Sequence, residues 1–336
     1  MRNNPRKKEQ VMISAAIVVC VAVIVAGYFI KSAKDREALQ IGSITLGSGA
    51  SAESSVVHYK GKAYQYNQNL MNVLFLGIDT TQDLSQEDMP GDAGQSDCIL
   101  VLSMDKQKKT ARLLQVSRDT MTNIDTYDVS GNYVSTIQGQ LALQYAYGTG
   151  GKSSCWAAKK TVSRLLYDLP IDAYFSMNLD GISAVNDAVG GVTLKLSEDA
   201  TEVDPTFKKG STITLQGDMA EQFVRKRDTN ISGSNVSRMK RQTEYITTLF
   251  QEMREFMNQN GNDFKETYTK LKLKPYTVTD LSMEQLEDML SYDFPKKNIE
   301  TVPGTTKEGK EHDEFYVDED GLHDLIIQMF YTEVKE

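Results

Sequence analysis

The chain has 336 residues, of which 40% are hydrophobic and 25% are charged, a composition that excludes a disordered or collagen-like protein. Its 46 acidic and 37 basic residues give a formal net charge of −9, so the molecule as a whole repels nucleic acid. Any site for an anion must therefore be a local cluster of basic residues.

An apolar segment over residues 11–30 contains neither a charged residue nor a proline. As a helix it spans roughly 30 Å, which matches the core of a bilayer. No convincing cleavage site follows it, so it is predicted to be a retained transmembrane anchor. Residues 1–10 are then a cytoplasmic tail, residues 31–55 a juxtamembrane helix and linker, and residues 56–336 an extracytoplasmic domain.

The domain begins with a predicted hairpin over residues 56–66, with Lys60 and Gly61 at its turn. Short runs dense in valine, isoleucine and leucine follow, and this density predicts buried central strands. The runs are residues 73–78, 99–102 and 111–116.

Apolar residues at helical spacing, or helix-capping patterns, mark five later segments. The predicted helices are residues 154–166, 182–189, 236–257, 282–290 and 321–331. Because strands and helices occur in mixed order, the sequence predicts an α/β fold.

Two cysteines, Cys98 and Cys155, lie outside the apolar segment. They either form a disulfide, which an extracytoplasmic location permits, or are separate buried thiols. The sequence gives no distance between them, so separate thiols are the favoured interpretation.

Acidic residues stand at the ends of the predicted central strands. Asp79 ends the run NVLFLGID, Asp97 precedes the second strand, and Arg118 and Asp119 follow the third. Ligands of α/β sheets gather at strand ends, and a carboxylate pair there can hold Mg²⁺. Aspartates beside strands are also common turn and cap residues, so the spacing alone leaves both interpretations open.

Basic residues gather in one short stretch of this acidic chain. Arginine has a planar fork that bonds phosphate oxygens in pairs, so two groups of arginines aimed at one point suit a diphosphate or a phosphodiester better than a carboxylate. Ordinary surface charge is the alternative interpretation. The first group is Arg225, Lys226 and Arg227, and the second is Arg238, Lys240 and Arg241, with Gln242 beside it.

Other familiar sites are disfavoured. Residues 146–154 end like a Walker A loop, but Ala146 replaces its first glycine, so the segment is interpreted as a loop that starts the helix carrying Trp156. The histidines are scattered without metal spacing, and no Gly-x-Ser-x-Gly elbow occurs. Zinc chemistry and triad hydrolysis are therefore poor explanations of this sequence.

Several phrases carry a resemblance to a known family: NVLFLGID, SDCILVLSMD, SRDTMTNID, YAYGTGG, DAYFSMNLDGISAVNDAVGGVTL, FVRKRD and RMKRQ. Together they resemble the LytR-CpsA-Psr proteins of Gram-positive bacteria, which are membrane-anchored enzymes that attach glycopolymers to peptidoglycan. The resemblance covers residues 56–336. It implies a single α/β domain with a central mixed β-sheet flanked by helices, and a hydrophobic pocket for a polyprenyl chain.

By position, the resemblance implies that Asp79 and Asp97 hold Mg²⁺, and that arginines with a polar partner bind the phosphates. It further implies catalytic roles for Arg118, Asp97 and Asp119, with Asp119 orienting Arg118. The implied phosphate-binding set is Arg118, Arg225, Arg227, Arg238, Arg241 and Gln242.

Three positions depart from the family pattern. Gln95 stands where the family usually has an arginine, Asn235 where it usually has an aspartate, and Ser117 where a proline is common. One phosphate contact and one carboxylate are therefore missing.

The resemblance implies Mg²⁺-assisted phosphoryl transfer of a teichoic-acid-like or capsular glycopolymer from polyprenyl diphosphate to a peptidoglycan sugar hydroxyl, with release of polyprenyl phosphate. The expected partners are this lipid-linked glycan, the peptidoglycan acceptor and the cell membrane, and nucleic acid is not among them. Two alternatives stay open: a non-catalytic binder or envelope regulator, suggested by Gln95 and Asn235, and a pyrophosphatase in which water replaces the sugar.

Overall fold

The computed structural model describes residues 56–228, 231–259, 263–294, 299–310 and 312–334. Residues 58–336 form one unit. None of the helices in the described ranges is long and apolar enough to cross a membrane. The anchor predicted over residues 11–30, and the segments predicted on either side of it, lie outside the described residues.

Within the described ranges the central sheet has six strands in the order β11-β8-β3-β4-β5-β12. It is mixed, because β3 runs parallel to β8 and antiparallel to β4, while β5 runs antiparallel to β4 and parallel to β12. The strands are β3 (Leu70–Ile78), β4 (Ser96–Asp105), β5 (Thr110–Val116), β8 (Ala173–Asn178), β11 (Thr277–Thr279) and β12 (Ile299–Thr301).

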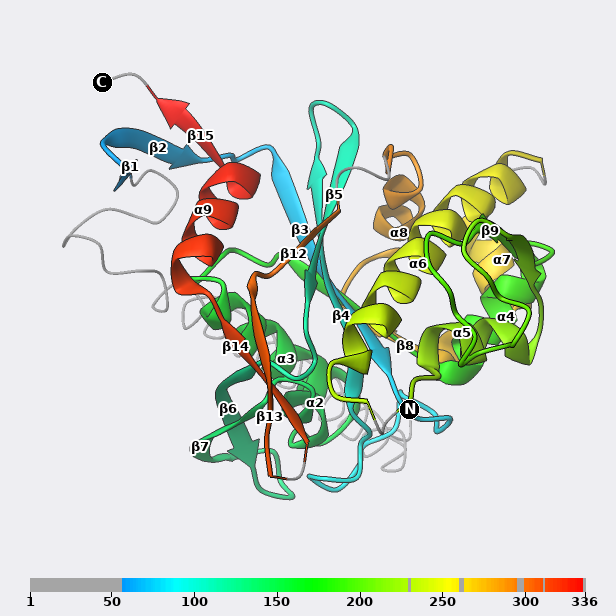
Figure 1. The fold of residues 1–336 in the computed structure, drawn as a ribbon, viewed down its shortest axis with the longest axis horizontal. Helices are drawn as coiled ribbons and strands as arrows, with labels where there is room; N and C mark the ends of the chain where they lie inside the picture. Colours follow the sequence, from blue (N-terminus) through cyan, green and yellow to red (C-terminus); the bar gives the residue numbers. More distant parts are fainter. Residues whose placement is uncertain (1–55, 229–230, 260–262, 295–298, 311, 335–336) are drawn as a thin grey trace, which may run out of the picture. The chain divides into compact units, whose positions relative to one another are not determined.

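Both faces of this sheet are buried, which explains why its central strands are apolar runs rather than alternating ones. Leu74 and Leu76 of β3 pack into a core with helices α3 (Gly151–Leu165) and α9 (Glu319–Phe330). Val73 and Phe75, which are two residues apart on β3, face the opposite core, against α6 (Ser234–Gln259) and α8 (Met283–Met289). Figure 1 shows the two helix layers on either side of the sheet.

The predicted N-terminal hairpin is present as β1 (Val56–Tyr59) and β2 (Lys62–Tyr66). Lys60 and Gly61 both have positive φ values, of 48° and 76°, as the tight turn of a two-residue hairpin requires. β2 also pairs with β15 (Tyr331–Val334), so the end of the described chain returns to its start.

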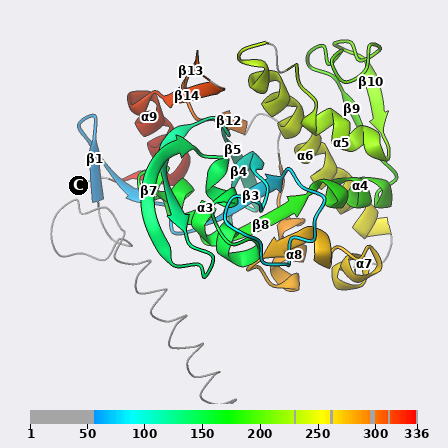
Figure 2. The ribbon, with the colours of Figure 1, turned by 90° about the horizontal axis from the view of Figure 1, so that it is seen from below.

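A second hairpin, β6 (Met121–Tyr127) and β7 (Tyr133–Gln140), lies beside α3 (Figures 1 and 2). A smaller core beside the sheet joins α4, α5, α6 and the pair β9–β10. The remaining elements are α2 (Leu143–Ala146), α4 (Leu179–Ala188), β9 (Val192–Lys195), β10 (Thr212–Leu215), α5 (Asp218–Arg225), α7 (Phe264–Lys270), η1 (Lys274–Tyr276), β13 (Gly304–Glu308) and β14 (Asp313–Val317).

Cys98 and Cys155 are both free thiols, so the disulfide alternative is wrong. Cys155 is buried as expected, whereas Cys98 is half-buried. The fold separates the two cysteines. Cys155 is a buried residue of α3, and its Sγ donates to the hydroxyl of Ser176. Cys98 borders the core on the opposite face of the sheet.

The expected α/β fold with a central mixed sheet flanked by helices is confirmed.

Candidate functional site

Three chain segments that are far apart in the sequence meet at one edge of the sheet. Asp79 follows β3, Asp97 is the second residue of β4, and Arg118 comes two residues after β5. Because β4 runs antiparallel to both neighbours, the end of β3, the start of β4 and the end of β5 share this edge. The pairing of the strands therefore brings acidic and basic side chains together although they are not adjacent in the sequence.

Asp97 accepts hydrogen bonds from two arginines. Arg118 bonds one carboxylate oxygen through Nη1, and Arg238 of α6 bonds the other through Nη1 at 2.7 Å. Both guanidiniums are largely buried, with side-chain exposures of 12% and 3%. Gln95 accepts a further bond from Arg118. Two positive guanidiniums and one negative carboxylate give these three groups together a net charge of +1.

Asp119 and Asn235 contact these two arginines: Asp119 pairs with Arg118, and Asn235 accepts a hydrogen bond from Arg238. Asn235 Nδ2 donates to Asp119 Oδ2 at 2.8 Å, while Asn235 Oδ1 accepts from Arg238 Nη2 at 2.8 Å. Arg118 Nε lies 3.4 Å from Asp119 Oδ1, and Gln140 donates to the same oxygen at 3.1 Å. Burial raises the pKa of Asp119 above its ordinary value, and the nearby arginine charges oppose that rise.

Asp79 forms an ion pair with a third arginine, Arg225. Arg225 is the last residue of α5, and its Nε lies 3.2 Å from Asp79 Oδ1. Glu221, one turn earlier, also pairs with Arg225 at 3.2 Å. Arg227 is half-buried in the loop after α5, and its charge acts on Asp119. Arg225 and Arg227 of the first basic group therefore reach the same edge as Arg118 and Arg238, whereas Lys226 bonds the carbonyl of Val203.

Arg241 is the predicted site residue that the structure does not bring to this cluster. It is 1% exposed, and its Nε donates to the carbonyl of Phe223 at 2.9 Å. Its other nitrogens bond Glu202 and the carbonyl of Lys226. Arg241 therefore ties the end of α5 to α6, which supports the segment that carries Arg225 and Arg227.

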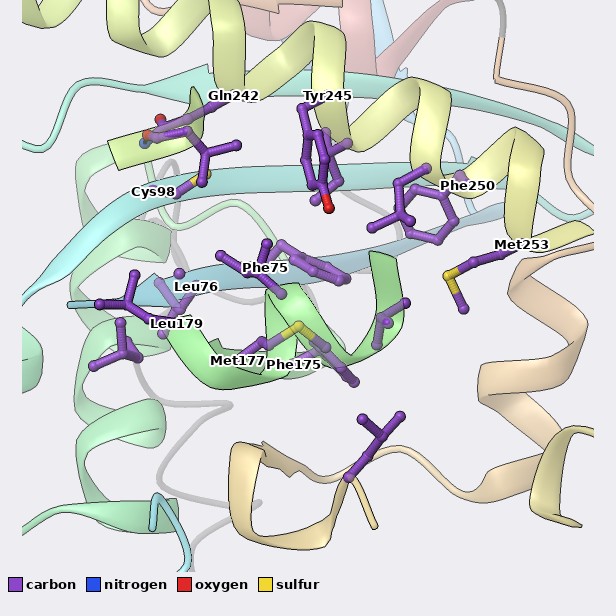
Figure 3. A pocket seen from close by; sticks show the side chains of 18 of the residues that line it. Phe75, Leu76, Cys98, Phe175, Met177, Leu179, Gln242, Tyr245, Phe250 and Met253 are labelled. Carbon is purple, nitrogen blue, oxygen red and sulfur yellow. Dashed lines mark hydrogen bonds between the residues drawn. The ribbon is translucent and has the colours of Figure 1, made fainter. Parts of the chain in front are cut away.

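A pocket opens beside Asp79, Asp97 and Arg225. Figure 3 shows side chains that line it. The pocket holds about 1210 Å³ of space free of protein atoms, its open mouth included. Its polar lining consists mainly of Asp79, Asp97, Arg225 and Gln242, and the other lining residues are almost all apolar. These include Phe75, Leu76, Cys98, Phe175, Met177, Leu179, Tyr245, Phe250 and Met253.

Aromatic packing shapes one wall of the pocket. Phe75 of β3 stacks on Phe175 of β8 with ring centroids 4.7 Å apart, and Phe250 of α6 meets Phe75 edge-on at 6.0 Å. At the polar end, Gln242 Nε2 donates to the carbonyl of Val224 at 3.1 Å, and its Oε1 has no hydrogen-bond partner among the described residues. An unpartnered buried oxygen in a pocket lining suits a ligand that can donate to it or a bound water.

The two rim carboxylates fit a hard divalent cation. No group of three or more acidic, histidine or cysteine side chains suited to a metal occurs among the described residues. Mg²⁺ commonly takes only one or two carboxylates and completes its shell with water and substrate phosphate. Asp79 and Asp97 both line the polar end of the pocket, so the donor set present is of that kind.

Three residues of this network are not predicted as participants by the sequence. Asn235 and Gln95 stand out in it only as departures from the family pattern, although each bonds a site arginine. Gln140 carried no signal, because it reaches Asp119 only through the pairing of β6 with β7.

A family model and two curated relatives match most of this chain. A model of the LytR_cpsA_psr family matches residues 43–328. TagU of Oceanobacillus iheyensis, named a polyisoprenyl-teichoic acid–peptidoglycan teichoic acid transferase, is 28% identical over 268 residues, which are 78% of this chain and 76% of that protein. TagV of Bacillus subtilis, which has the same kind of name, is 26% identical over 252 residues, or 73% of this chain. The match spans only 58% of the length of TagV.

Solved structures share the fold. The crystal structure of B. subtilis TagV has a TM-score of 0.57 at 21% identity, and the match covers 78% of this chain and 96% of that one. A structure of TagT bound to LI-WTA has a TM-score of 0.55 at 20% identity and covers 85% of this chain and 96% of that one.

Proposed function

The chain belongs to the LytR_cpsA_psr family, and from this premise we propose that it transfers a glycopolymer from a polyprenyl diphosphate carrier to a sugar hydroxyl of peptidoglycan. The polymer would be of the teichoic acid or capsular type, and the names of TagU and TagV support this choice. The observation that carries the proposal is one pocket with an apolar body and a charged rim.

The chemistry of such a donor matches this division. A polyprenyl chain is a branched hydrocarbon, and the apolar body of the pocket offers it a site that excludes water. Its diphosphate needs cations and hydrogen-bond donors. Arg225 supplies them in the pocket lining, and Arg118 and Arg238 supply them beside it, where they pair with the lining residue Asp97. Soluble sugar nucleotides would leave the apolar body without a partner.

In the proposed step, the acceptor hydroxyl oxygen attacks the phosphorus on the glycan side of the diphosphate. A new phosphorus–oxygen bond forms, the bond to the bridging oxygen breaks, and polyprenyl phosphate leaves with that electron pair. The hydroxyl proton passes to one of the rim carboxylates, Asp79 or Asp97. Arg118 and Arg238 hold the phosphate oxygens as negative charge moves to the leaving group, while Asp119 and Asn235 keep both guanidiniums oriented.

We also propose that Asp79 and Asp97 hold Mg²⁺. Bound there, the cation would neutralise charge on the diphosphate. The carboxylates are paired with arginines, so their roles require that these arginines turn to the phosphates when the donor is present.

Membrane attachment completes the proposal. The apolar sequence of residues 11–30 supports a single transmembrane anchor with the remaining chain outside the cytoplasm. Such an anchor keeps the pocket close to the bilayer in which a polyprenyl donor resides.

The test measures release of polyprenyl phosphate by the full chain in detergent micelles, using a polyprenyl-diphosphate disaccharide with and without Mg²⁺. We expect release to depend on Mg²⁺ and to fall roughly 100-fold or more in Arg118→Ala, because one preorganised charge contact to the transition state is lost. Arg254→Ala is the matched control, because it removes a different arginine, which lies on α6 and bonds the carbonyl of Tyr292. Equal release by Arg118→Ala and the control would contradict the assignment.

A non-catalytic lipid binder is the second candidate, and Gln95 is the observation that favours it. This side chain accepts a bond from Arg118 and adds no positive charge to the rim. If the full chain binds the donor without releasing polyprenyl phosphate, and Gln95→Arg tightens binding without turnover, the binder is correct. If Gln95→Arg raises turnover, the chain is an enzyme, and supplying glycan acceptor then distinguishes transfer from hydrolysis.

A further inference from the structure

A surface outside the pocket combines aromatic and basic side chains. Along α3, residues spaced four apart share one face, which lies beside the β6–β7 hairpin (Figures 1 and 2). Trp156, the single tryptophan of the chain, is 36% exposed, and Tyr133 on β7 is 58% exposed. We call this surface the α3 platform; it consists of Lys152, Trp156, Lys160 and Arg164 on α3 and Tyr127, Tyr133, Thr136 and Asp125 on the hairpin.

Consecutive contacts connect the two aromatic ends of the α3 platform. Tyr133 Oη lies 3.0 Å from Thr136 Oγ1, which donates to Asp125 at 2.7 Å. Lys160 Nζ lies 3.3 Å from the same carboxylate and 5.7 Å from the centroid of the Trp156 ring. The platform is therefore a continuous row with a ring at each end and polar groups between them.

The platform is positively charged although the chain has a net charge of −9. Its one acid, Asp125, has a side-chain exposure of 3% and is shared by Lys160 and Arg164, the latter at 3.5 Å. Lys152 adds a third exposed cation one turn before Trp156. Asp168 nearby also interacts with the charge of Arg164, so three cations face two carboxylates and a local excess of positive charge remains.

Both borders of the platform connect to the site. At the base of the hairpin, Gln140 donates to Asp119, which orients Arg118. At the other border, the loop between Asp79 and Gln95 packs against the start of α3, where Asp88 N bonds the carbonyl of Thr149 at 3.0 Å. A polymer lying on the platform thus borders the two segments that carry the rim acids and their arginines.

We propose that the α3 platform binds the acceptor, a peptidoglycan glycan strand of N-acetylated sugars with carboxylate-bearing peptide stems. This inference rests on the proposed function, because it supplies the acceptor for that transfer. Sugar faces with their C–H groups pack well on exposed Trp156 and Tyr133 rings. The stem carboxylates match the cations Lys152, Lys160 and Arg164.

The same features argue against two other occupants. A polyphosphate chain has no C–H faces to pack on aromatic rings, so it would leave the exposed rings of Trp156 and Tyr133 without a partner. A membrane surface favours apolar side chains that insert among lipids, whereas this row is built on a buried carboxylate bonded to Thr136.

The single tryptophan makes the test direct, because the intrinsic tryptophan fluorescence of the full chain comes from Trp156 alone. The full chain in detergent micelles is titrated with soluble peptidoglycan glycan strands, and binding is followed by this fluorescence and by calorimetry. We expect a saturable change with the wild type. Tyr133→Ala and Lys152→Glu, which keep the tryptophan, should each raise the Kd about tenfold, and Trp156→Ala should do the same by calorimetry.

Matched controls separate this effect from general surface changes. Tyr316→Ala removes a tyrosine of β14 that is 40% exposed and packs against Lys307 of β13. Lys195→Glu reverses an exposed charge on β9. Both should bind strands like the wild type. Release of polyprenyl phosphate without acceptor should be unchanged in the platform variants, whereas transfer to strands should fall.

The inference is overturned if the platform variants bind strands as tightly as Tyr316→Ala and Lys195→Glu. It is also overturned if anionic vesicles or a polyphosphate polymer, but not glycan strands, produce the Trp156-dependent signal. If no variant releases polyprenyl phosphate while strands still bind through Trp156, the proposed transfer fails and the glycan platform stands.

Discussion

The side chain at position 235 performs two tasks that require an amide. Its Nδ2 donates to the buried Asp119, and its Oδ1 accepts from Arg238. A carboxylate could still accept from the arginine, but it would place a second negative charge against Asp119 Oδ2, which lies 2.8 Å from Asn235 Nδ2. The departure from the family pattern at this position is therefore a working substitution in the network and not a gap in it.

Asp119 should give the protein a distinctive response to pH. Burial raises its folded-state pKa above the ordinary carboxyl value, so its contribution to stability is fully present below the unfolded-state pKa. That contribution is lost as the pH rises through the raised folded-state pKa. We expect the free energy of unfolding of Asp119→Asn, relative to wild type, to improve over that rise, as measured by denaturant unfolding.

Asp128→Asn is the control, because backbone hydrogen bonding from Asn132 lowers the pKa of Asp128 and gives the opposite slope. Parallel pH curves for wild type and Asp119→Asn would show that Asp119 is not destabilised by burial.

Arg238 and Arg241 have the same residue type but different partners in the structure. Both belong to one basic run on α6, and the sequence predicted a phosphate role for each. The structure turns Arg238 toward Asp97 and Arg241 toward the carbonyls at the end of α5. Residues three apart share one face of a helix, so the spacing predicts that both point the same way. The packing of α5 against α6 separates them, because it brings the carbonyls of Phe223 and Lys226 to Arg241.

At the scale of elements, the glycine-rich segment before α3 has a structural function. Gly148 approaches the start of the helix so closely that an added Cβ would lie 2.7 Å from Ser154 Cα. Ser154 Oγ in turn accepts from the backbone N of Gly150 at 2.9 Å. The glycines that resemble a phosphate loop are thus explained by close packing at a helix start.

Gly148→Ala should therefore lower the free energy of unfolding by roughly 1–3 kcal/mol, as expected for overpacking. The measurement is urea unfolding followed by circular dichroism. Gly61→Ala is the matched control, because its positive φ is strained but nothing lies within 4 Å of the added Cβ, so its cost should be about 1 kcal/mol. A Gly148→Ala protein as stable as wild type would show that the helix start relaxes freely.

The sequence predicted the elements whose burial pattern is simple. The runs that became β3, β4 and β5 are almost wholly apolar, and α8 is announced by a capping box between Ser282 and Gln285. β8 was missed although it lies beside β3, because Ser176 and Asn178 interrupt its apolar pattern. The three-residue strands β11 and β12 depend on partners distant in sequence, and no local signal marks them.

For the whole molecule, the pocket is the feature that sequence patterns could not supply. Apolar spacing says that Ile246 and Leu249 face inward, but it does not say whether neighbours fill the space before them. The sheet, α6 and the segments around α7 and α8 each contribute lining residues, and the space results from their assembly.

Filling this space should separate lipid recognition from phosphate recognition. Ile246 is half-buried and lines the pocket, so Ile246→Trp should weaken binding of a polyprenyl diphosphate at least about tenfold. A short water-soluble diphosphate, which engages only the rim, should bind as before. Calorimetry with both ligands makes the comparison, and Glu255→Trp on the exposed side of α6 is the control. Equal losses for both ligands would mean that the substitution disturbs the rim.

Asp97 has a consequence for how the ligands of this site affect one another. Arg118 and Arg238 share its carboxylate, so the ligand-free rim supplies its own counter-anion. A phosphate that draws the arginines away frees Asp97 for a cation, and a cation on Asp97 frees the arginines for phosphate. Thermodynamic linkage then requires that each ligand tighten the other by the same factor, so donor and Mg²⁺ should bind with reciprocal positive cooperativity.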